Sequence, residues 1–223
     1  HGLIPVAEAL QDADTFGVTD VDEADLLAAS GNTKPILILQ GIIERADINR
    51  IAKVGYQVVI HHFEQLAWLE KELAKINLTK PLSIWLKMNS GMGRLGITPT
   101  DYVKTYQNLQ NKAWCKEVIL MTHLANANLI DSDLNQHQLS TFSKVTQELP
   151  DSATSIPASS GLLAGIGDNT DWVRPGIMLY GSSPFPFSDE HLRREAFGLH
   201  AVMTLQSNLI SIQNCKAGDN VGY

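Results

Sequence analysis

The feature that most constrains the fold of this 223-residue sequence is a regular alternation of short apolar runs with longer amphipathic segments. The seven apolar runs are rich in Val, Ile and Leu and lie at residues 15–19, 36–40, 57–61, 82–88, 117–122, 153–158 and 173–181. Helical periodicity occurs at residues 5–10, 21–29, 46–54, 63–75, 100–109, 134–148 and 162–166. Strands that are apolar on both faces need cover on both sides, which crossover helices provide. The alternation therefore predicts an α/β fold with a parallel sheet.

Two α/β folds have this alternation of strands and helices: the eight-stranded β/α barrel and the open, doubly wound sheet that binds nucleotides at a glycine-rich turn. Residues 91–96 (GMGRLG) have suitably spaced glycines, but they follow the fourth run, and Arg94 would obstruct a close approach of the backbone to a ligand. The TIM-like barrel is therefore favoured, although seven strands are one too few. Residues 5–10 have the pattern of a helix that follows a strand, so we expect the first strand of the barrel before residue 1.

The pattern changes near the carboxyl end. Residues 182–190 (SSPFPFSDE) have the Pro, Ser and Phe content of a linker, and residues 200–213 alternate polar and apolar side chains as exposed strands do. We therefore expect a partial β/α barrel domain over residues 1–195 and the beginning of a β-rich C-terminal domain over residues 196–223.

Composition excludes several classes of protein. Acidic residues outnumber basic ones by 24 to 17, and no cluster of Lys and Arg suits a nucleic-acid backbone. No apolar run approaches the length of a membrane span, and the amino end lacks the pattern of a secretory signal. Cys115 and Cys215 are far apart, without metal or redox spacing, as expected of thiols in a reducing compartment. These features predict a cytoplasmic enzyme or small-molecule binder without nucleic-acid or membrane partners.

Polar residues follow the sixth and seventh predicted strands, and active sites of β/α barrels lie at the carboxyl ends of the strands. Ser159 and Ser160 precede Gly161 at a predicted helix start, where a hydroxyl and free N–H groups bind phosphate well. For the serines alone an ordinary helix cap is the better interpretation. The backbone of Gly176 and Ile177 on the next strand adds two donors, and the combination favours a phosphate site.

Four basic side chains also lie at predicted strand ends. Arg174 lies within an apolar strand and needs either a carboxylate or a polar pocket, and His123 follows another apolar run. Either residue alone is more often structural, but together at the end of one barrel they favour an active site. Lys87 lies within IWLKM, where a buried ammonium must pair or lose its charge. Arg94 would repel it, unless a carbamate made the lysine anionic.

The other histidines carry no predicted role in catalysis. His61 and His62 precede a helix, which His62 is suited to cap, and His137 lies on an amphipathic helix. No metal-ligand spacing is found among the seven histidines, so we predict no metal site.

Four segments that contain these residues resemble the alanine racemase family in their order and spacing. They are KMNSGMGRLG at 87–96, MTHLANAN at 121–128, PASSGLLA at 157–164 and WVRPGIMLYG at 172–181. The resemblance implies a fold-type III barrel that binds pyridoxal 5′-phosphate, followed by a β domain. It implies an isomerase that interconverts L-alanine and D-alanine by two-base proton transfer on a pyridoxal-phosphate aldimine.

The resemblance also bears on the amino end. The family lysine that binds the cofactor stands in a Lys-x-x-Ala-Tyr-Gly-His-Gly segment, whose last two residues match His1 and Gly2. We therefore expect this sequence to be truncated at both ends, to begin just after that lysine, and to be inactive by itself.

The resemblance assigns cofactor-binding roles position by position. Arg174 matches the arginine that donates to the pyridine nitrogen, and His123 matches the histidine near the ring that is linked to that arginine. Ser160, with the backbone of Gly176 and Ile177, matches the phosphate site.

Other matches concern the substrate and the proton transfer. Arg94 matches the arginine that binds the phenolic oxygen, beside the substrate, and Lys87 matches the lysine that is carbamylated in many members to hold it. Tyr223 matches the second catalytic base, which reaches the cofactor of the partner subunit, so Tyr223, His123 and Arg174 are the expected catalytic residues. Two departures exist: Ser159 stands where many members have asparagine, and Asn128 where an acid is frequent.

The family further implies a cytoplasmic bacterial enzyme that acts on alanine as a head-to-tail homodimer and supplies D-alanine for peptidoglycan. Alternatives with a similar cofactor barrel are a broad-specificity amino-acid racemase and a fold-type III amino-acid decarboxylase. An alternative of another class is a non-catalytic pyridoxal-phosphate carrier, against which the predicted β segment ending in Tyr223 argues.

Overall fold

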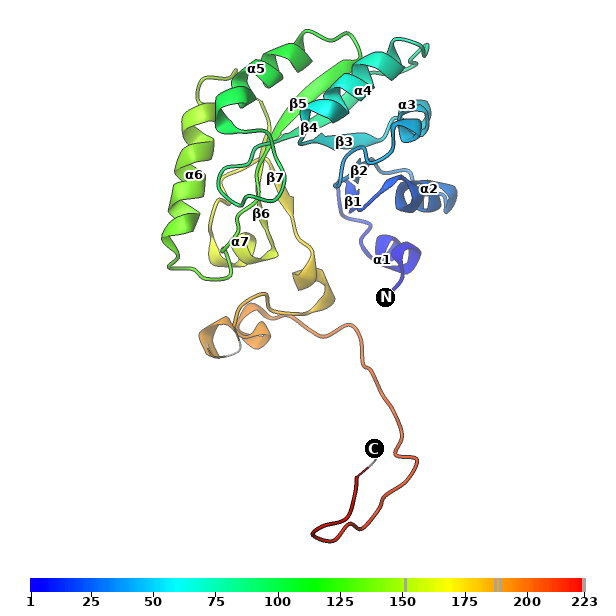
Figure 1. The fold of residues 1–223 in the computed structure, drawn as a ribbon, viewed down its shortest axis with the longest axis vertical. Helices are drawn as coiled ribbons and strands as arrows, with labels where there is room; N and C mark the ends of the chain where they lie inside the picture. The colour runs from blue at the N-terminus through cyan, green and yellow to red at the C-terminus, as the bar shows by residue number, and fades with distance from the viewer. Residues whose placement is uncertain (151, 187, 189, 222–223) are drawn as a thin grey trace.

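The computed structural model describes residues 1–150, 152–186, 188 and 190–221, and within them seven parallel strands form one curved sheet (Figure 1). The strands are paired in chain order: β1 (Phe16–Val18), β2 (Ile36–Ile38), β3 (Gln57–Ile60), β4 (Leu82–Lys87), β5 (Cys115–Met121), β6 (Thr154–Ala158) and β7 (Trp172–Arg174). Residues of β1 and β7 line a common cavity, and no pairing joins these two strands in the described chain. The prediction of a β/α barrel with seven parallel strands in this sequence is therefore confirmed.

Helices lie outside the sheet and connect its strands (Figure 1). They are α1 (Leu3–Ala9), α2 (Val21–Ala29), α3 (Ile48–Val54), α4 (Phe63–Leu73), α5 (Pro99–Gln110), α6 (Asp133–Thr146) and α7 (Ser159–Ala164). Short 3-10 segments occur at η1 (Arg45–Asp47), η2 (Ile177–Tyr180), η3 (Glu190–Leu192) and η4 (Arg194–Phe197). Asp20 caps α2 by accepting a hydrogen bond from the Glu23 amide, 3.0 Å away, and His62 caps α4 through the Glu64 amide, at 3.2 Å. None of the described helices has the length and apolarity of a membrane span.

The core has two layers because side chains alternate along each strand. All six residues of β4 are buried: one set packs against the helices, and the other faces the inside of the barrel. The inner layer is built around Trp85, which contacts Trp172 edge to face with ring centroids 5.4 Å apart. Lys87 is two residues beyond Trp85, so it faces the same interior at the carboxyl end of the strand.

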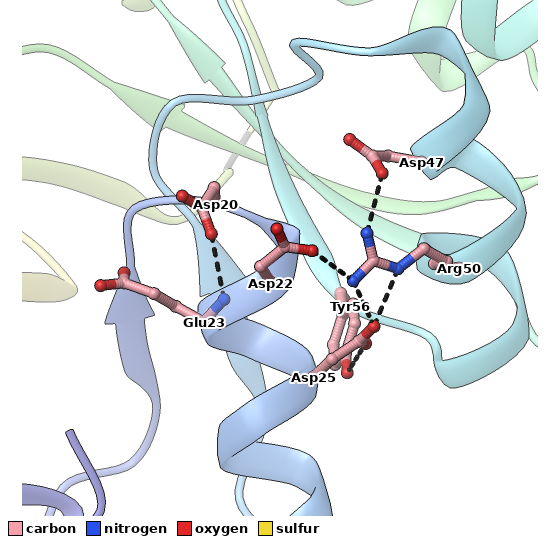
Figure 2. Close-up of polar contacts among 7 residues, drawn as sticks. All are labelled: Asp20, Asp22, Glu23, Asp25, Asp47, Arg50 and Tyr56. Carbon is pink, nitrogen blue, oxygen red and sulfur yellow. Dashed lines mark hydrogen bonds and ion pairs between the residues drawn. The ribbon is translucent and has the colours of Figure 1, made fainter.

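A polar cluster joins α2 to α3 on the outside of the barrel (Figure 2). The Arg50 guanidinium contacts the carboxylates of Asp22 and Asp25, both at 2.6 Å, and of Asp47 at 3.0 Å. The Tyr56 hydroxyl donates to Asp25 at 2.6 Å. Burial alone would raise the pKa of Asp25, but the hydrogen bonds from Tyr56 and Arg50 hold it below its usual value. The cluster therefore fixes the first two crossovers against each other.

Two elements have a boundary that differs from the sequence prediction by three residues or more. The run at 173–181 is a strand only as far as Arg174, because Pro175 has no N–H to donate and the chain turns into η2 at Ile177. The helix expected at 162–166 begins three residues earlier, at Ser159, and ends at Ala164 before Gly165 in the left-handed conformation.

The carboxyl-terminal segment runs away from the barrel (Figure 1). Residues 201–221 contain no helix or strand in the part of the chain that is described, and all of them are exposed. The predicted division into a barrel domain over 1–195 and the start of a β domain over 196–223 stays a prediction.

Candidate active site

Basic side chains gather inside the barrel, at the carboxyl end of the sheet. Lys87 is the last residue of β4, His123 follows β5 by two residues, and Arg174 is the last residue of β7. The charges of Arg174 and Arg94 reach Lys87, because both lower its pKa, and they also lower the pKa of His123. The sequence-predicted cations are thus brought together at one site.

Arg174 is held by neutral acceptors. Its guanidinium donates to the Ser155 hydroxyl, to the Thr122 carbonyl at 2.8 Å and to the Ile156 carbonyl at 2.9 Å. Burial lowers the pKa of Arg174 to about 10, so it remains protonated at neutral pH. These contacts fix the guanidinium without cancelling its charge.

Lys87 and His123 have pKa values below their usual ones. Lys87 is only 6% exposed, and burial, with help from Arg174 and Arg94, lowers its pKa to about 8. Burial, followed by the charges of Arg174, Lys87 and Arg94, lowers the pKa of His123 to about 4. At neutral pH the imidazole is therefore uncharged, and a sizeable fraction of Lys87 is a neutral amine by pH 8.

No carboxylate forms an ion pair with Lys87, Arg94 or Arg174 in the described residues. Lys87 and Arg174 are largely withdrawn from solvent, and like charges placed so close together are costly unless an opposite charge completes the group. An anionic ligand supplies that charge, and a phosphorylated cofactor with a phenolic oxygen fits such a donor set. Within the same described chain no group of His, Cys, Asp or Glu suits a metal ion.

Two turns at the late strands are tied together by Ser159. Its hydroxyl accepts hydrogen bonds from the amides of Gly176, at 2.9 Å, and Met178, at 3.3 Å. Ser159 therefore joins the start of α7 to the turn after β7, and no side chain caps α7. Ser160 and Ile177 lie beside this junction, one residue on from Ser159 and Gly176 respectively, where the sequence places the phosphate site.

Arg94 is carried by a closed loop after β4. The loop is pinned where it begins and ends by the Asn89 amide donating to Ile97, at 2.9 Å, and the Ile97 amide donating to Lys87, at 2.8 Å. The Asn89 side chain accepts from the Gly93 amide at 2.9 Å. The loop is thus anchored directly beside Lys87, while the Arg94 side chain is exposed.

His61 belongs to the same end of the barrel and was not expected there from the sequence. Its Nε2 lies 2.9 Å from the Gln40 carbonyl and 3.0 Å from Gln65 Nε2. Burial is the main cause of its lowered pKa, and the charge of Lys87 adds to it. The available signal was its spacing, because His61 is two residues beyond the inward-facing Val59.

A cavity of about 680 Å³ opens from the site between β1 and β7. Its lining includes Trp85, Trp172, Arg174, Gly176 and Tyr180. Of the described candidate site residues only Arg174 and Gly176 line it, so the cavity is the space between the two edge strands beside the site. Tyr223, the expected second base, lies outside the described residues.

Comparisons with known proteins give one result throughout. Residues 1–184 match the family model described as alanine racemase, N-terminal domain. The catabolic alanine racemase of Pseudomonas putida is 40% identical over 224 residues, covering all of this chain and 60% of that protein. The biosynthetic alanine racemase of Salmonella typhimurium is 39% identical over 230 residues, with the same coverage.

Solved structures agree. The biosynthetic alanine racemase of Pseudomonas aeruginosa superposes with a TM-score of 0.81 and 32% identity over 90% of this chain and 54% of that one. The alanine racemase of Acinetobacter baumannii gives a TM-score of 0.83 and 30% identity over 97% of this chain and 58% of that one. The chain spans about 60% of the length of the curated relatives it matches.

Proposed function

The chain belongs to the alanine racemase family, and from that premise we propose that its barrel binds pyridoxal 5′-phosphate and takes part in interconverting L-alanine and D-alanine. The observation that carries the proposal is the cluster of Lys87, Arg94 and Arg174, which has no carboxylate partner in the described chain. An anionic cofactor neutralises this charge.

The residues that hold the cofactor come from three strand ends. Ser160 and the backbone N–H of Ile177 would bind the phosphate, whereas the predicted donor Gly176 gives its N–H to Ser159, which holds the turn in place. Arg174 would donate to the pyridine nitrogen, and Arg94 to the phenolic oxygen. When bound, pyridoxal phosphate supplies an electron sink that stabilises negative charge at the α-carbon of the amino acid.

Proton transfer falls to side chains with suitable charge states. Arg174 stays protonated, so with the cofactor bound it would donate to the pyridine nitrogen and keep that nitrogen unprotonated. His123 is neutral at neutral pH, so it can accept a proton there. Tyr223 is the proposed second base.

Lys87 is suited to modification by carbon dioxide. Its lowered pKa leaves a fraction of neutral amine, whose nitrogen forms a bond to the carbon of CO2 and releases a proton. The resulting carbamate is anionic, so Lys87 would then hold Arg94 instead of repelling it.

We further propose that the whole protein is a cytoplasmic head-to-tail homodimer that supplies D-alanine for peptidoglycan. In such a dimer Tyr223 of one protomer reaches the site of its partner.

Interconversion of alanine enantiomers tests the function. Residues 1–223 alone are expected not to racemise alanine and to yield no adduct at Lys87 when treated with pyridoxal phosphate and borohydride, because Lys87, the one buried lysine of the described residues, stands on β4. A borohydride-stable adduct at Lys87 would contradict this. In the whole protein, Tyr223→Phe should abolish racemisation in at least one direction, whereas full activity in both would remove Tyr223 from the mechanism.

A further inference from the structure

Gln138 lies on α6, outside the barrel, yet its side chain binds two of the loops that carry site residues. It is fully buried, with 0% exposure. Its Oε1 accepts from the Ala125 amide at 2.8 Å, and its Nε2 donates to the His123 carbonyl at 3.1 Å and to the Ser90 hydroxyl at 3.3 Å. His123 and Ala125 follow β5, whereas Ser90 follows β4. One amide therefore connects the carboxyl ends of two neighbouring strands.

The hydrogen bonds beyond Ser90 can run in one direction only. The Thr122 hydroxyl donates to the Met88 carbonyl at 3.0 Å, which uses its single hydrogen. The Ser90 hydroxyl, 2.8 Å from that of Thr122, must therefore donate to it and accept from Gln138. Each hydrogen in this buried series of hydrogen bonds has one possible acceptor. All the groups are therefore satisfied only when position 138 supplies an N–H donor.

The same series of hydrogen bonds contacts the cationic site on two sides. The carbonyl of Thr122 accepts from Arg174 at 2.8 Å, so the residue that ends the series also fixes the guanidinium. A Cβ added to Gly91 would lie 3.1 Å from the Gln138 side chain, so the loop that carries Arg94 packs directly on Gln138.

We propose that Gln138 is a positioning residue that sets the placement of His123, Arg94 and Arg174 relative to one another for cofactor binding. The inference rests on the proposed function for the identity of the cofactor. The contacts themselves belong to Gln138 and the loops after β4 and β5.

A matched pair of variants separates positioning from stability. Gln138→Glu replaces the donor by a carboxylate oxygen that faces the His123 carbonyl, so two acceptors oppose each other. Asn135→Asp makes the same change on the same helix: Asn135 is 1% exposed and donates to the carbonyls of Leu129, at 3.0 Å, and Ile130, at 3.4 Å. Neither carbonyl belongs to the cationic site.

The measurements are the dissociation constant for pyridoxal 5′-phosphate by fluorescence titration, the His123 ring resonances by NMR, and the thermal midpoint. Both variants should lower the midpoint. Only Gln138→Glu should weaken binding, by roughly tenfold or more, and move the His123 resonances. Binding within about twofold of wild type with unmoved His123 resonances, or an equal loss in Asn135→Asp, would overturn the proposal.

A second variant decides the question if Gln138→Glu does not fold. Ser90→Ala removes the link to Thr122 without adding charge and should weaken binding by roughly threefold, with a shift at His123. Wild-type affinity with unmoved resonances in Ser90→Ala would overturn the proposal. If the wild-type chain itself does not bind pyridoxal phosphate, the proposed function fails, and the His123 resonances alone decide whether Gln138 positions the loop.

Discussion

His123 lies among three cations, and this determines how the folded chain responds to acid. Burial and the charges of Arg174, Lys87 and Arg94 lower its pKa to about 4, against 6.5 for an ordinary histidine. The unfolded chain therefore takes up a proton at His123 before the folded chain does. The resulting stabilisation is complete above pH 6.5 and is lost as the pH falls toward 4.

In the variant His123→Gln, the unfolding free energy should therefore fall less between pH 6.5 and 4 than it does in the wild type. We expect a difference of about 2 kcal/mol, since solvent screens part of the interaction. Urea unfolding at a series of pH values measures it. The exposed His137→Gln serves as control and should keep the wild-type slope. Equal slopes in all three proteins would show that His123 is not held neutral by its surroundings.

At the residue scale, the sequence predicted which side chains meet but not what holds them. Lys87, His123 and Arg174 were identified because an ionisable side chain in or next to a buried apolar strand is costly unless it has a partner or a function. His61 was missed, although it has the same inward spacing, because a histidine before a helix also has a simple structural explanation. Gln138 gave no signal, since an amide on an amphipathic helix is ordinary until its burial is known.

At the scale of elements, the loop between β4 and α5 depends on one glycine for its closure. Gly96 has φ +133°, a conformation available only to glycine, and an added Cβ would meet the Asn89 amide nitrogen and lie 2.6 Å from the Met88 carbonyl carbon. Gly93, in the same loop, has φ +74° with open space around its Cβ position. Alanine substitutions at these two positions therefore separate the cost of a left-handed backbone conformation, present at both, from the cost of a steric collision, present only at Gly96.

Gly96→Ala should cost at least about 3 kcal/mol of unfolding free energy, because Cβ forces the two ends of the loop apart. Gly93→Ala should cost about 1 kcal/mol, the usual penalty for a left-handed alanine. Denaturant titration of both variants provides the comparison. Similar costs would mean that the loop ends adjust easily and do not hold Arg94 in place.

Element boundaries were predictable where the local chemistry is strong. Asp20 and Glu23 at the start of α2 set its beginning, and α2 covers the predicted residues 21–29. The end of β7 was misplaced because an apolar composition continues through Met178 and Leu179, while the backbone is turned by Pro175 and Gly176. Composition alone does not reveal which apolar residues can still pair in a sheet.

At the scale of the whole molecule, repetition made the barrel predictable, because each of the seven strands carries the same pattern. The carboxyl-terminal segment has no such internal support. Residues 200–213 alternate like a strand, but alternation specifies only the face of a strand and not its partner. In the described chain the segment has nothing to pair with, and Leu205, Leu209 and Ile210 are 93%, 83% and 101% exposed.

An unpaired segment that exposes apolar side chains promotes association between copies of a chain. Removing residues 201–223 should therefore leave the barrel folded and raise the fraction of monomer at a given concentration, as measured by sedimentation velocity. The shortened chain should also bind less of a hydrophobic dye, because it exposes less apolar surface. A matched control, Leu205→Ser with Ile210→Ser in the uncut chain, should act in the same direction, because it removes apolar surface without shortening the chain. If the shortened chain associates as before, the contacts between copies involve the open side of the barrel between β1 and β7, where Val173 and Ile177 are also exposed.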